Sequence, residues 1–229
     1  MKTIGLIGGM SWESSDLYYQ LINKQVAETQ GGLHSAKIIL YSVNFHEIEK
    51  LQSEGNWSES AKILSGIALK LESIGADVIG LCTNTMHLVA DHIQNSITVP
   101  FLHIAEAVAE KINAEHKKTV LLLGTTFTMQ KEFYKEKLLK HGIDVVVPEI
   151  AHQEIINSVI YTELCKGKVL QSSKDQYIEI INANIKRGIE GVILGCTEIG
   201  MLIENKDLNI PIYDSTEIHA SKLVKFILE

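Results

Sequence analysis

The chain is poor in cysteine: it has three in 229 residues, and none of them are closely spaced. An odd number of separated cysteines does not form the disulfide framework of a small secreted protein. No basic and apolar leader comes before the first strand pattern, and no apolar run approaches the length of a membrane span. We therefore expect a cytoplasmic protein with reduced thiols and no membrane partner.

Several motifs of ligand-binding proteins are also missing. The sequence has no C-x-x-C and no H-x-x-x-H pair, so it does not favour a bound metal ion. It contains neither a P-loop nor the G-x-G-x-x-G of dinucleotide sites, and Gly8-Gly9 is either a tight structural turn or a carboxylate-binding one. The net charge of -7 argues against a nucleic-acid backbone as the main partner.

Two short apolar runs lead into a cysteine and then into polar residues. Residues 192–195 run into Cys196-Thr197-Glu198, and residues 78–81 run into Cys82-Thr83-Asn84, 114 positions earlier (192 minus 78). Such uninterrupted apolar runs are typical of strands buried on both faces of a parallel sheet. Because open α/β sheets bind ligands at the carboxyl ends of their strands, we expect one site built from two halves.

Other strand patterns recur in the same order. The pattern that begins at Thr3 recurs at Thr119, an offset of 116, and the Pro100 strand recurs at Pro211, an offset of 111. This repetition predicts an internal duplication: an α/β protein of two halves, each with about four parallel strands flanked by helices. We expect a cleft between the halves to be lined by strand ends. The predicted halves are residues 1–98 with 209–229, and residues 99–208.

Cys196 is the leading candidate for chemistry. The pKa of a thiol is lowered at a helix N-terminus, so we expect a helix after Cys196 to activate it. Thr197 is suited to capping that helix, and Glu198 falls in its first turn. The alternative is a buried, inert cysteine. The similar run at Cys82-Thr83 favours chemistry.

Three motifs together resemble a known family. Gly8-Gly9-Met10 near the start, residues 84–87 (Asn-Thr-Met-His) and residues 195–198 (Gly-Cys-Thr-Glu) resemble the aspartate/glutamate racemases, which are cofactor-independent amino-acid racemases. The resemblance covers nearly the whole chain. It implies two domains related by pseudo-twofold symmetry, an active site in the cleft between them, often a homodimer, and no pyridoxal phosphate (PLP). In that family two thiols flank the substrate Cα; one removes the proton and the other returns it on the opposite face.

The first cysteine motif departs from the family pattern. The usual sequence is Cys-Asn-Thr-Ala-His, whereas this chain has Cys-Thr-Asn-Thr-Met-His from Cys82, so Thr83 takes the position of the thiol. Because side chains alternate along a strand, Cys82 is expected to point to the other side. Our hypothesis is that Cys196 is the main acid/base and that Thr83, directly or through water, serves the opposite face. The alternative is that a bulge brings Cys82 into place.

The resemblance also indicates which groups bind an acidic amino acid. Amide and hydroxyl donors at strand ends would stabilise a carbanion next to a carboxylate, and a lysine would pair with the side-chain carboxylate. The candidate substrate-binding residues are Met10, Ser11, Gln52, Asn84, Thr85, Thr125, Thr126, Lys168, Thr197 and Glu198.

These observations predict a PLP-independent isomerase that racemises aspartate or glutamate, from the subgroup with Cys-Thr-Asn-Thr in the first motif. One alternative is the same fold acting on another carboxylic acid, as a hydantoin racemase, maleate isomerase or malonate decarboxylase. The other is a catalytically silent small-acid binding protein, in which Cys82 and Cys196 are core residues.

Overall fold

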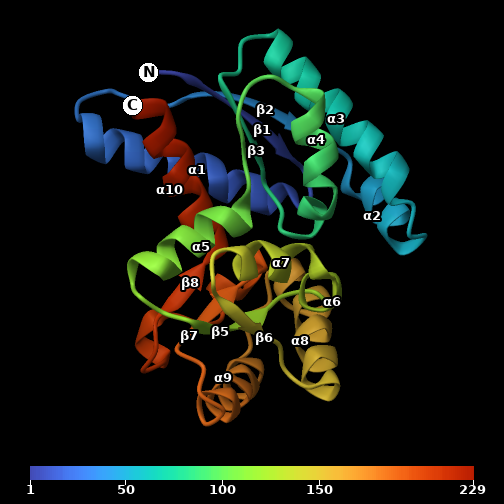
Figure 1. Ribbon diagram of the computed structural model, residues 1–229, viewed down its shortest axis with the longest axis vertical. Helices are drawn as coiled ribbons and strands as arrows, with labels where there is room; N and C mark the ends of the chain where they lie inside the picture. The colour runs from blue at the N-terminus through green and yellow to red at the C-terminus, as the bar shows by residue number, and fades with distance from the viewer. The chain divides into compact units, whose positions relative to one another are not determined.

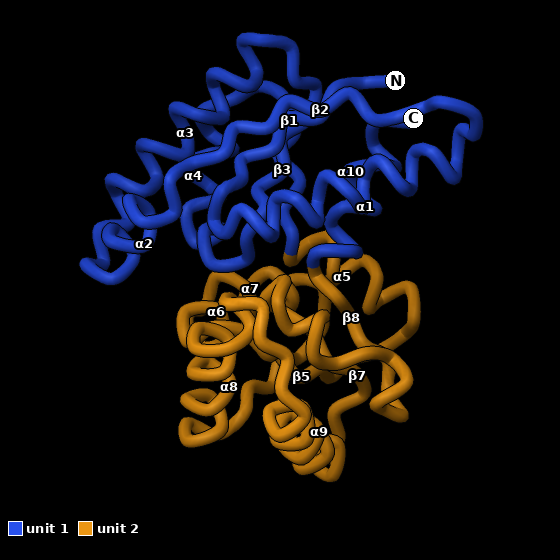
Figure 2. The backbone as a smooth tube through the Cα atoms, turned by 180° about the vertical axis from the view of Figure 1, so that it is seen from behind, with its two compact units in different colours: residues 1–104, 216–229 blue, residues 105–215 orange.

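The computed structural model describes residues 1–229, and the chain forms two compact units (Figures 1 and 2). Unit 1 comprises residues 1–104 and 216–229, and unit 2 comprises residues 105–215. Each unit has one sheet of four parallel strands accompanied by helices. The predicted α/β fold with two parallel sheets is therefore confirmed. No helix combines the length and the apolar composition needed to cross a bilayer.

Unit 1 contains four strands, five α-helices and one short 3₁₀ helix. Its strands are β1 (Thr3–Gly8), β2 (Lys37–Ser42), β3 (Val78–Leu81) and β4 (Phe101–Leu102). Its helices are α1 (Trp12–Gln30), α2 (Phe45–Ser53), α3 (Trp57–Ser73), the 3₁₀ helix η1 (Thr85–Val89), α4 (Ala90–Ser96) and nearly all of α10 (Ser215–Leu228). The strand order is β2-β1-β3-β4.

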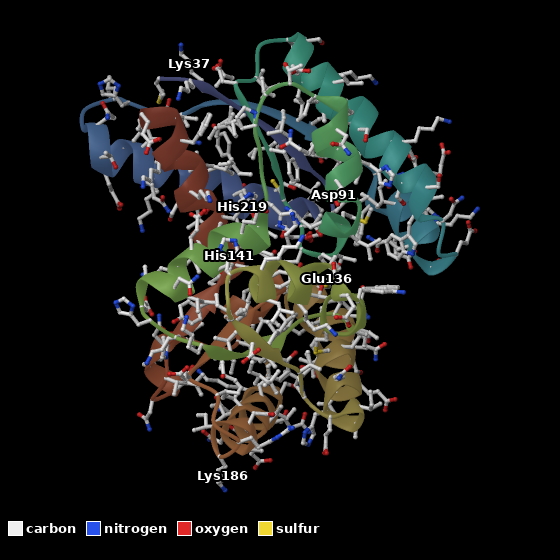
Figure 3. The ribbon with its side chains drawn as sticks, in the orientation of Figure 1. Lys37, Asp91, Glu136, His141, Lys186 and His219 are labelled. Carbon is white, nitrogen blue, oxygen red and sulfur yellow. The ribbon has the colours of Figure 1, made fainter.

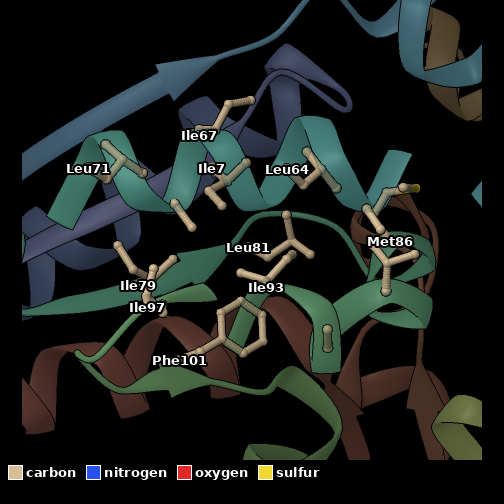
Figure 4. Packing of buried hydrophobic residues seen from close by; sticks show 14 of the residues in the cluster. Ile7, Leu64, Ile67, Leu71, Ile79, Leu81, Met86, Ile93, Ile97 and Phe101 are labelled. Carbon is tan, nitrogen blue, oxygen red and sulfur yellow. The ribbon is translucent and has the colours of Figure 1, made fainter. Parts of the chain in front are cut away.

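Helices cover both faces of the unit 1 sheet. Ile4 and Leu6 of β1 pack with α1 and α10, whereas Ile7 packs with α3 and α4. Figure 4 shows Leu64 and Leu71 of α3 in the same cluster as Ile7. This double coverage explains why β1 is apolar or glycine at every position after its first residue, as is usual for a parallel strand.

Unit 2 repeats this arrangement with the strand order β6-β5-β7-β8. Its strands are β5 (Thr119–Leu123), β6 (Asp144–Val146), β7 (Gly191–Leu194) and β8 (Ile212–Asp214). Its helices are α5 (Ile104–Ala114), α6 (Thr126–Gln130), α7 (Glu132–Lys140), α8 (Ile150–Thr162), α9 (Gln171–Ile185) and the 3₁₀ helices η2 (Leu164–Lys166), η3 (Thr197–Met201) and η4 (Asn205–Asp207). Alternate residues of β5 and β7 share one hydrophobic cluster with α8 and α9.

Equivalent carboxylates join the first and third strands of each sheet. Asp77, directly before β3, accepts a hydrogen bond from the Thr3 N–H at 2.7 Å. Glu190, directly before β7, accepts one from the Thr119 N–H at 3.1 Å. The two sheets therefore repeat in their side-chain connections as well as in their strand order.

The fourth strands mark where the unit boundaries differ from the predicted ones. The predicted boundaries at 98/99 and 208/209 assign β4 to the C-terminal half and β8 to the N-terminal half. In the structure Phe101 of β4 pairs with Ile79 of β3, and Asp214 of β8 pairs with Leu194 of β7. Each fourth strand satisfies its backbone hydrogen bonds in the sheet of the half that precedes it, so the chain leaves a unit only after that strand.

Candidate active site

The ends of β3 and β7 can be aligned by their backbone hydrogen bonds. The Cys82 N–H donates to Ile7 O at 2.9 Å, and the Gly195 N–H donates to Leu123 O at 2.7 Å. Each bond extends the pairing with the neighbouring strand by one residue. Cys82 and Gly195 therefore hold equivalent positions.

Thr83 and Cys196 are consequently structural counterparts, 113 positions apart (196 minus 83) rather than the 114 of the sequence comparison. Side-chain alternation agrees with this alignment. Cys196 packs against the cluster that contains Leu194, and Thr83 is two residues from Leu81, which belongs to the equivalent cluster of unit 1. Cys82 lies instead in the cluster with α1 and α10 and is fully buried, which raises the pKa of its thiol.

Cys196 is held in its protonated form. Its Sγ–H donates a hydrogen bond to Glu198 Oε2 at 3.0 Å. Burial and the charge of Glu198 raise the pKa of the Cys196 thiol well above its ordinary value. The expected lowering of this pKa is therefore wrong, because a carboxylate next to the thiol and its burial both favour the neutral form.

The cap at this helix also differs from the expectation. Cys196 itself is the N-cap of η3, with extended backbone angles, and no side chain caps the helix. Thr197 is the first helical residue and is half-buried. A five-residue 3₁₀ helix offers little dipole to a neighbouring thiol, since the macrodipole needs many aligned peptides.

Lys168 lies in the segment between η2 and α9. Its side chain is exposed, and its N–H donates to Glu163 O at 3.0 Å. η2 packs against η3, the helix that follows Cys196. The lysine segment and the thiol segment are therefore close neighbours within unit 2.

Thr125 and Thr126 follow β5 in unit 2. Thr125 is buried and caps α6 by accepting the Thr128 N–H at 3.4 Å. The Thr126 N–H donates to Asn157 Oδ1 at 2.9 Å. Both residues lie at the carboxyl end of the sheet that carries Cys196.

The turn after β1 occupies the matching place in unit 1. Gly9 has a φ of +90°, and a Cβ there would lie 2.3 Å from Val43 O, so no other residue fits. The Gly9 N–H donates to Ser15 Oγ at 2.7 Å, and the Ser11 side chain caps α1 by accepting the Ser14 N–H at 3.2 Å. The Gly9 amide is thus used within the turn, which favours the structural interpretation of this glycine pair.

The remaining candidates of unit 1 are mostly buried. Met10, Gln52, Asn84 and Thr85 each expose less than a tenth of their surface. The Gln52 amide donates to Met86 Sδ at 2.8 Å, which ties α2 to η1. Asn84 and Thr85 begin η1 directly after Thr83, so the structure brings these two candidates together beside it.

A group of buried histidines behind Thr83 is absent from the sequence-based candidates. The His87 and His103 ring centroids are 4.5 Å apart, and those of His87 and His219 are 5.9 Å apart. His219, labelled in Figure 3, lies on α10 and contacts Tyr18 Oη through Nδ1 at 2.8 Å. Burial keeps the pKa of His87 well below its usual value and lowers that of His219 to about 4. Only the place of His87 in the first cysteine motif hinted at this group.

No cluster of three or more His, Cys, Asp and Glu side chains has the arrangement needed to hold a metal ion. The chemistry available from the chain itself is that of a thiol with a carboxylate in unit 2 and a hydroxyl with amide neighbours in unit 1. These groups suit proton transfer.

A model of the Asp/Glu/Hydantoin racemase family matches residues 7–223. Over 170 residues the chain is 30% identical to the broad specificity amino-acid racemase RacX of Bacillus subtilis (strain 168). The matched region covers 74% of this chain and 73% of RacX. The fold is similar to the crystal structure of a candidate Asp/Glu racemase from Yersinia pestis, with 48% identity, a TM-score of 0.96 and 100% of both chains covered. It is also similar to an aspartate racemase homologue from Pyrococcus horikoshii OT3, with 38% identity, a TM-score of 0.88 and 100% of both chains covered.

Proposed function

The chain belongs to the Asp/Glu/Hydantoin racemase family, and we therefore propose that it is a PLP-independent racemase of aspartate or glutamate. The family relationship confirms the resemblance seen in the motifs. The relatives named above support a racemase, which is an isomerase, at the level of the class. The acidic substrate, the acid/base residues and the mechanism are the proposal.

The observation that carries the proposal is the hydrogen bond from the Cys196 thiol to Glu198. A protonated thiol cannot remove a Cα proton, so Cys196 must first lose its own. Glu198 is the carboxylate placed to accept that proton. The thiolate then takes the Cα proton, and the electron pair of the broken C–H bond stays on the substrate as a carbanion next to its carboxylate.

Thr83 serves the opposite face in this proposal. Its hydroxyl, directly or through water, gives a proton to Cα. Glu198 then releases its proton to solvent, and solvent restores the hydroxyl proton of Thr83. The alternative residue, Cys82, lies in the hydrophobic cluster at the position that Gly195 has in unit 2. Because a hydroxyl is a far weaker acid than a thiol, we expect the enzyme to prefer one enantiomer as its substrate.

In this proposal, different groups of the chain bind the two carboxylates of the substrate. We assign the α-carboxylate and the carbanion to hydroxyl and amide donors at strand ends, which act where negative charge develops. Lys168 is exposed, and we assign the side-chain carboxylate of the substrate to it. The donors are Ser11, Asn84, Thr85, Thr125, Thr126 and Thr197, with Met10 and Gln52 shaping the unit 1 side. A cytoplasmic location and a homodimer complete the proposal.

The test is Cα-proton exchange followed by NMR in heavy water, with L- and D-aspartate and L- and D-glutamate measured separately. We expect exchange with the natural sequence and a loss of at least about 100-fold in Cys196→Ala, the scale of a lost acid/base group. Thr29→Ala changes an exposed residue near the end of α1 and is the control. Absence of exchange with all four amino acids overturns the proposal.

One observation favours a second candidate, the silent small-acid binding protein. The Cys196 thiol donates its proton in a hydrogen bond to Glu198, which raises the pKa of the thiol and holds it in the unreactive protonated form. This candidate predicts that aspartate or glutamate binds in calorimetry while no Cα proton exchanges. Exchange that depends on Cys196 excludes it.

A further inference from the structure

We propose that His87 is a positioning residue for Thr83, and that it acts in a single neutral tautomer with the proton on Nδ1. The inference rests on the proposed function, because it concerns the residue assigned to one face of the substrate. Thr83 comes two residues after the end of β3, so no partner strand holds its carbonyl group. His87 supplies that missing bond.

The two hydrogen bonds of the ring define the tautomer. Nδ1 lies 2.7 Å from the Thr83 carbonyl oxygen, which can only accept, so Nδ1 carries the proton. The Ile104 N–H donates to Nε2 at 3.2 Å, so Nε2 must be unprotonated. A protonated ring would set two N–H groups against each other at Ile104.

The imidazole thereby links two points of the chain that matter to the site. Thr83 carries the proposed acid/base hydroxyl, and Ile104 is the residue at which the chain leaves unit 1. His87 is almost fully buried, so water cannot replace it in either bond. A shift of the ring changes the backbone position of Thr83.

The surroundings of His87 keep it neutral. His103 faces it from the segment after β4, and His219 faces it from α10. Tyr18 of α1 reaches His219, and Lys222 of α10 adds positive charge near that ring. Burial and the neighbouring imidazoles hold the pKa of His87 well below its usual value, so the Nδ1–H form persists at neutral pH.

Unit 2 has no such ring. The counterpart of His87 is Gly200 (87 plus 113), and a Cβ there would lie 2.7 Å from Asp214 Oδ2. The carbonyl of Cys196, which is the counterpart of the Thr83 carbonyl, instead accepts a hydrogen bond from the Ile199 N–H at 3.1 Å. His87 therefore serves the Thr83 face and not the Cys196 face, and this selectivity can be measured.

The experiment separates two outcomes of exchange in heavy water. For the enantiomer whose Cα proton faces Cys196, exchange with retention needs only the Cys196 face, whereas inversion needs both faces. We expect His87→Phe, which fills the space without hydrogen bonds, to slow inversion about 10- to 100-fold, the scale of a misplacement near 1 Å, and to leave retention within about twofold. His87→Gln, which can donate and accept, should recover part of the inversion. His92→Gln changes an exposed histidine and is the control.

An equal loss of retention and inversion in both His87 variants, or no loss of either, overturns the inference while the proposed function stands. Absence of all exchange in the unchanged protein overturns the proposed function, and this inference with it. A second measurement does not depend on activity or on the folding of a variant. Long-range ¹H–¹⁵N spectra of the unchanged protein should show His87 Nδ1 protonated and Nε2 unprotonated at neutral pH, and the opposite tautomer overturns the inference.

Discussion

Unit 1 and unit 2 build the same four-stranded sheet and end its third strand in different chemistry. In unit 1 a buried thiol, Cys82, is followed by the Thr83 hydroxyl, with imidazoles behind it. In unit 2 Gly195 is followed by the Cys196 thiol, with the Glu198 carboxylate 3.0 Å away. The two units therefore share the positions of their strand ends and differ in the acidity and charge of the residues found there.

Some side-chain connections are the same in both units because they hold the sheet together. The carboxylates of Asp77 and Glu190 join the first and third strands in the same way in both units. Both carboxylates directly precede their strands, β3 and β7. They therefore lie at the amino ends of these strands, away from the carboxyl ends that lead to Thr83 and Cys196. The difference between Thr83 and Cys196 lies at the carboxyl ends, where open α/β sheets place their ligands.

Thr83→Cys is expected to have the largest effect on the difference between the two units, because it places a thiol at the equivalent strand end of both. We expect the ratio of L-directed to D-directed racemisation rates to change by about tenfold or more, as an acid/base group of suitable pKa replaces a poor one. The measurement is circular dichroism of each enantiomer over time. Thr29→Cys adds a thiol at an exposed threonine as the control, and an unchanged ratio contradicts the assignment of Thr83.

Glu198→Gln removes the negative charge next to Cys196 and tests how that charge affects the reactivity of the thiol. Burial still raises the pKa of the thiol, but the carboxylate no longer does, so the thiolate fraction at neutral pH rises. We expect iodoacetamide to alkylate Cys196 about three- to tenfold faster, as measured by peptide mass spectrometry at pH 7. Glu154→Gln, on the exposed surface of α8, should leave the rate unchanged. Slower alkylation in Glu198→Gln would show that the carboxylate activates the resting thiol.

Cys82→Ala has the smallest expected effect on activity. The side chain is fully buried among apolar residues, so its loss should cost about 1 kcal/mol of unfolding free energy, as measured in urea. Exchange and racemisation should stay within about twofold of the natural sequence. A loss comparable to that of Cys196→Ala would make Cys82, and not Thr83, the partner.

Much of this fold could be predicted because its central strands, β1, β3, β5 and β7, are buried on both faces. Apolar runs such as residues 192–195 indicate a parallel sheet without help from other parts of the chain. The alternation of side chains also predicts that Cys82 points away from the face of Thr83. The boundaries between the two units could not be predicted, because the strand segments around Pro100 and Pro211 are too short to indicate which sheet they complete.

The thiol environment and the histidine group could not be predicted. A carboxylate two positions after Cys196 can favour a helix start or bond the thiol, and only the folded side chains decide between these. His87, His103 and His219 lie far apart in the sequence. They meet because β4 pairs with β3 and α10 returns to unit 1.

The return of α10 has a consequence for the order in which the chain completes its fold during synthesis. Unit 2 is one continuous segment, so all four of its strands are available once residue 215 has been made. The unit 1 sheet is complete only after α10 has been made, because this helix packs against it. Leu223 of α10 lies so close to Gly80 that a Cβ at Gly80 would come within 2.9 Å of the leucine side chain. Until that helix arrives, Ile4 and Leu6 lack part of their cover, and such exposed apolar surface is what chaperones bind in partly made chains. The half that leaves the ribosome first is thus the half that is finished last.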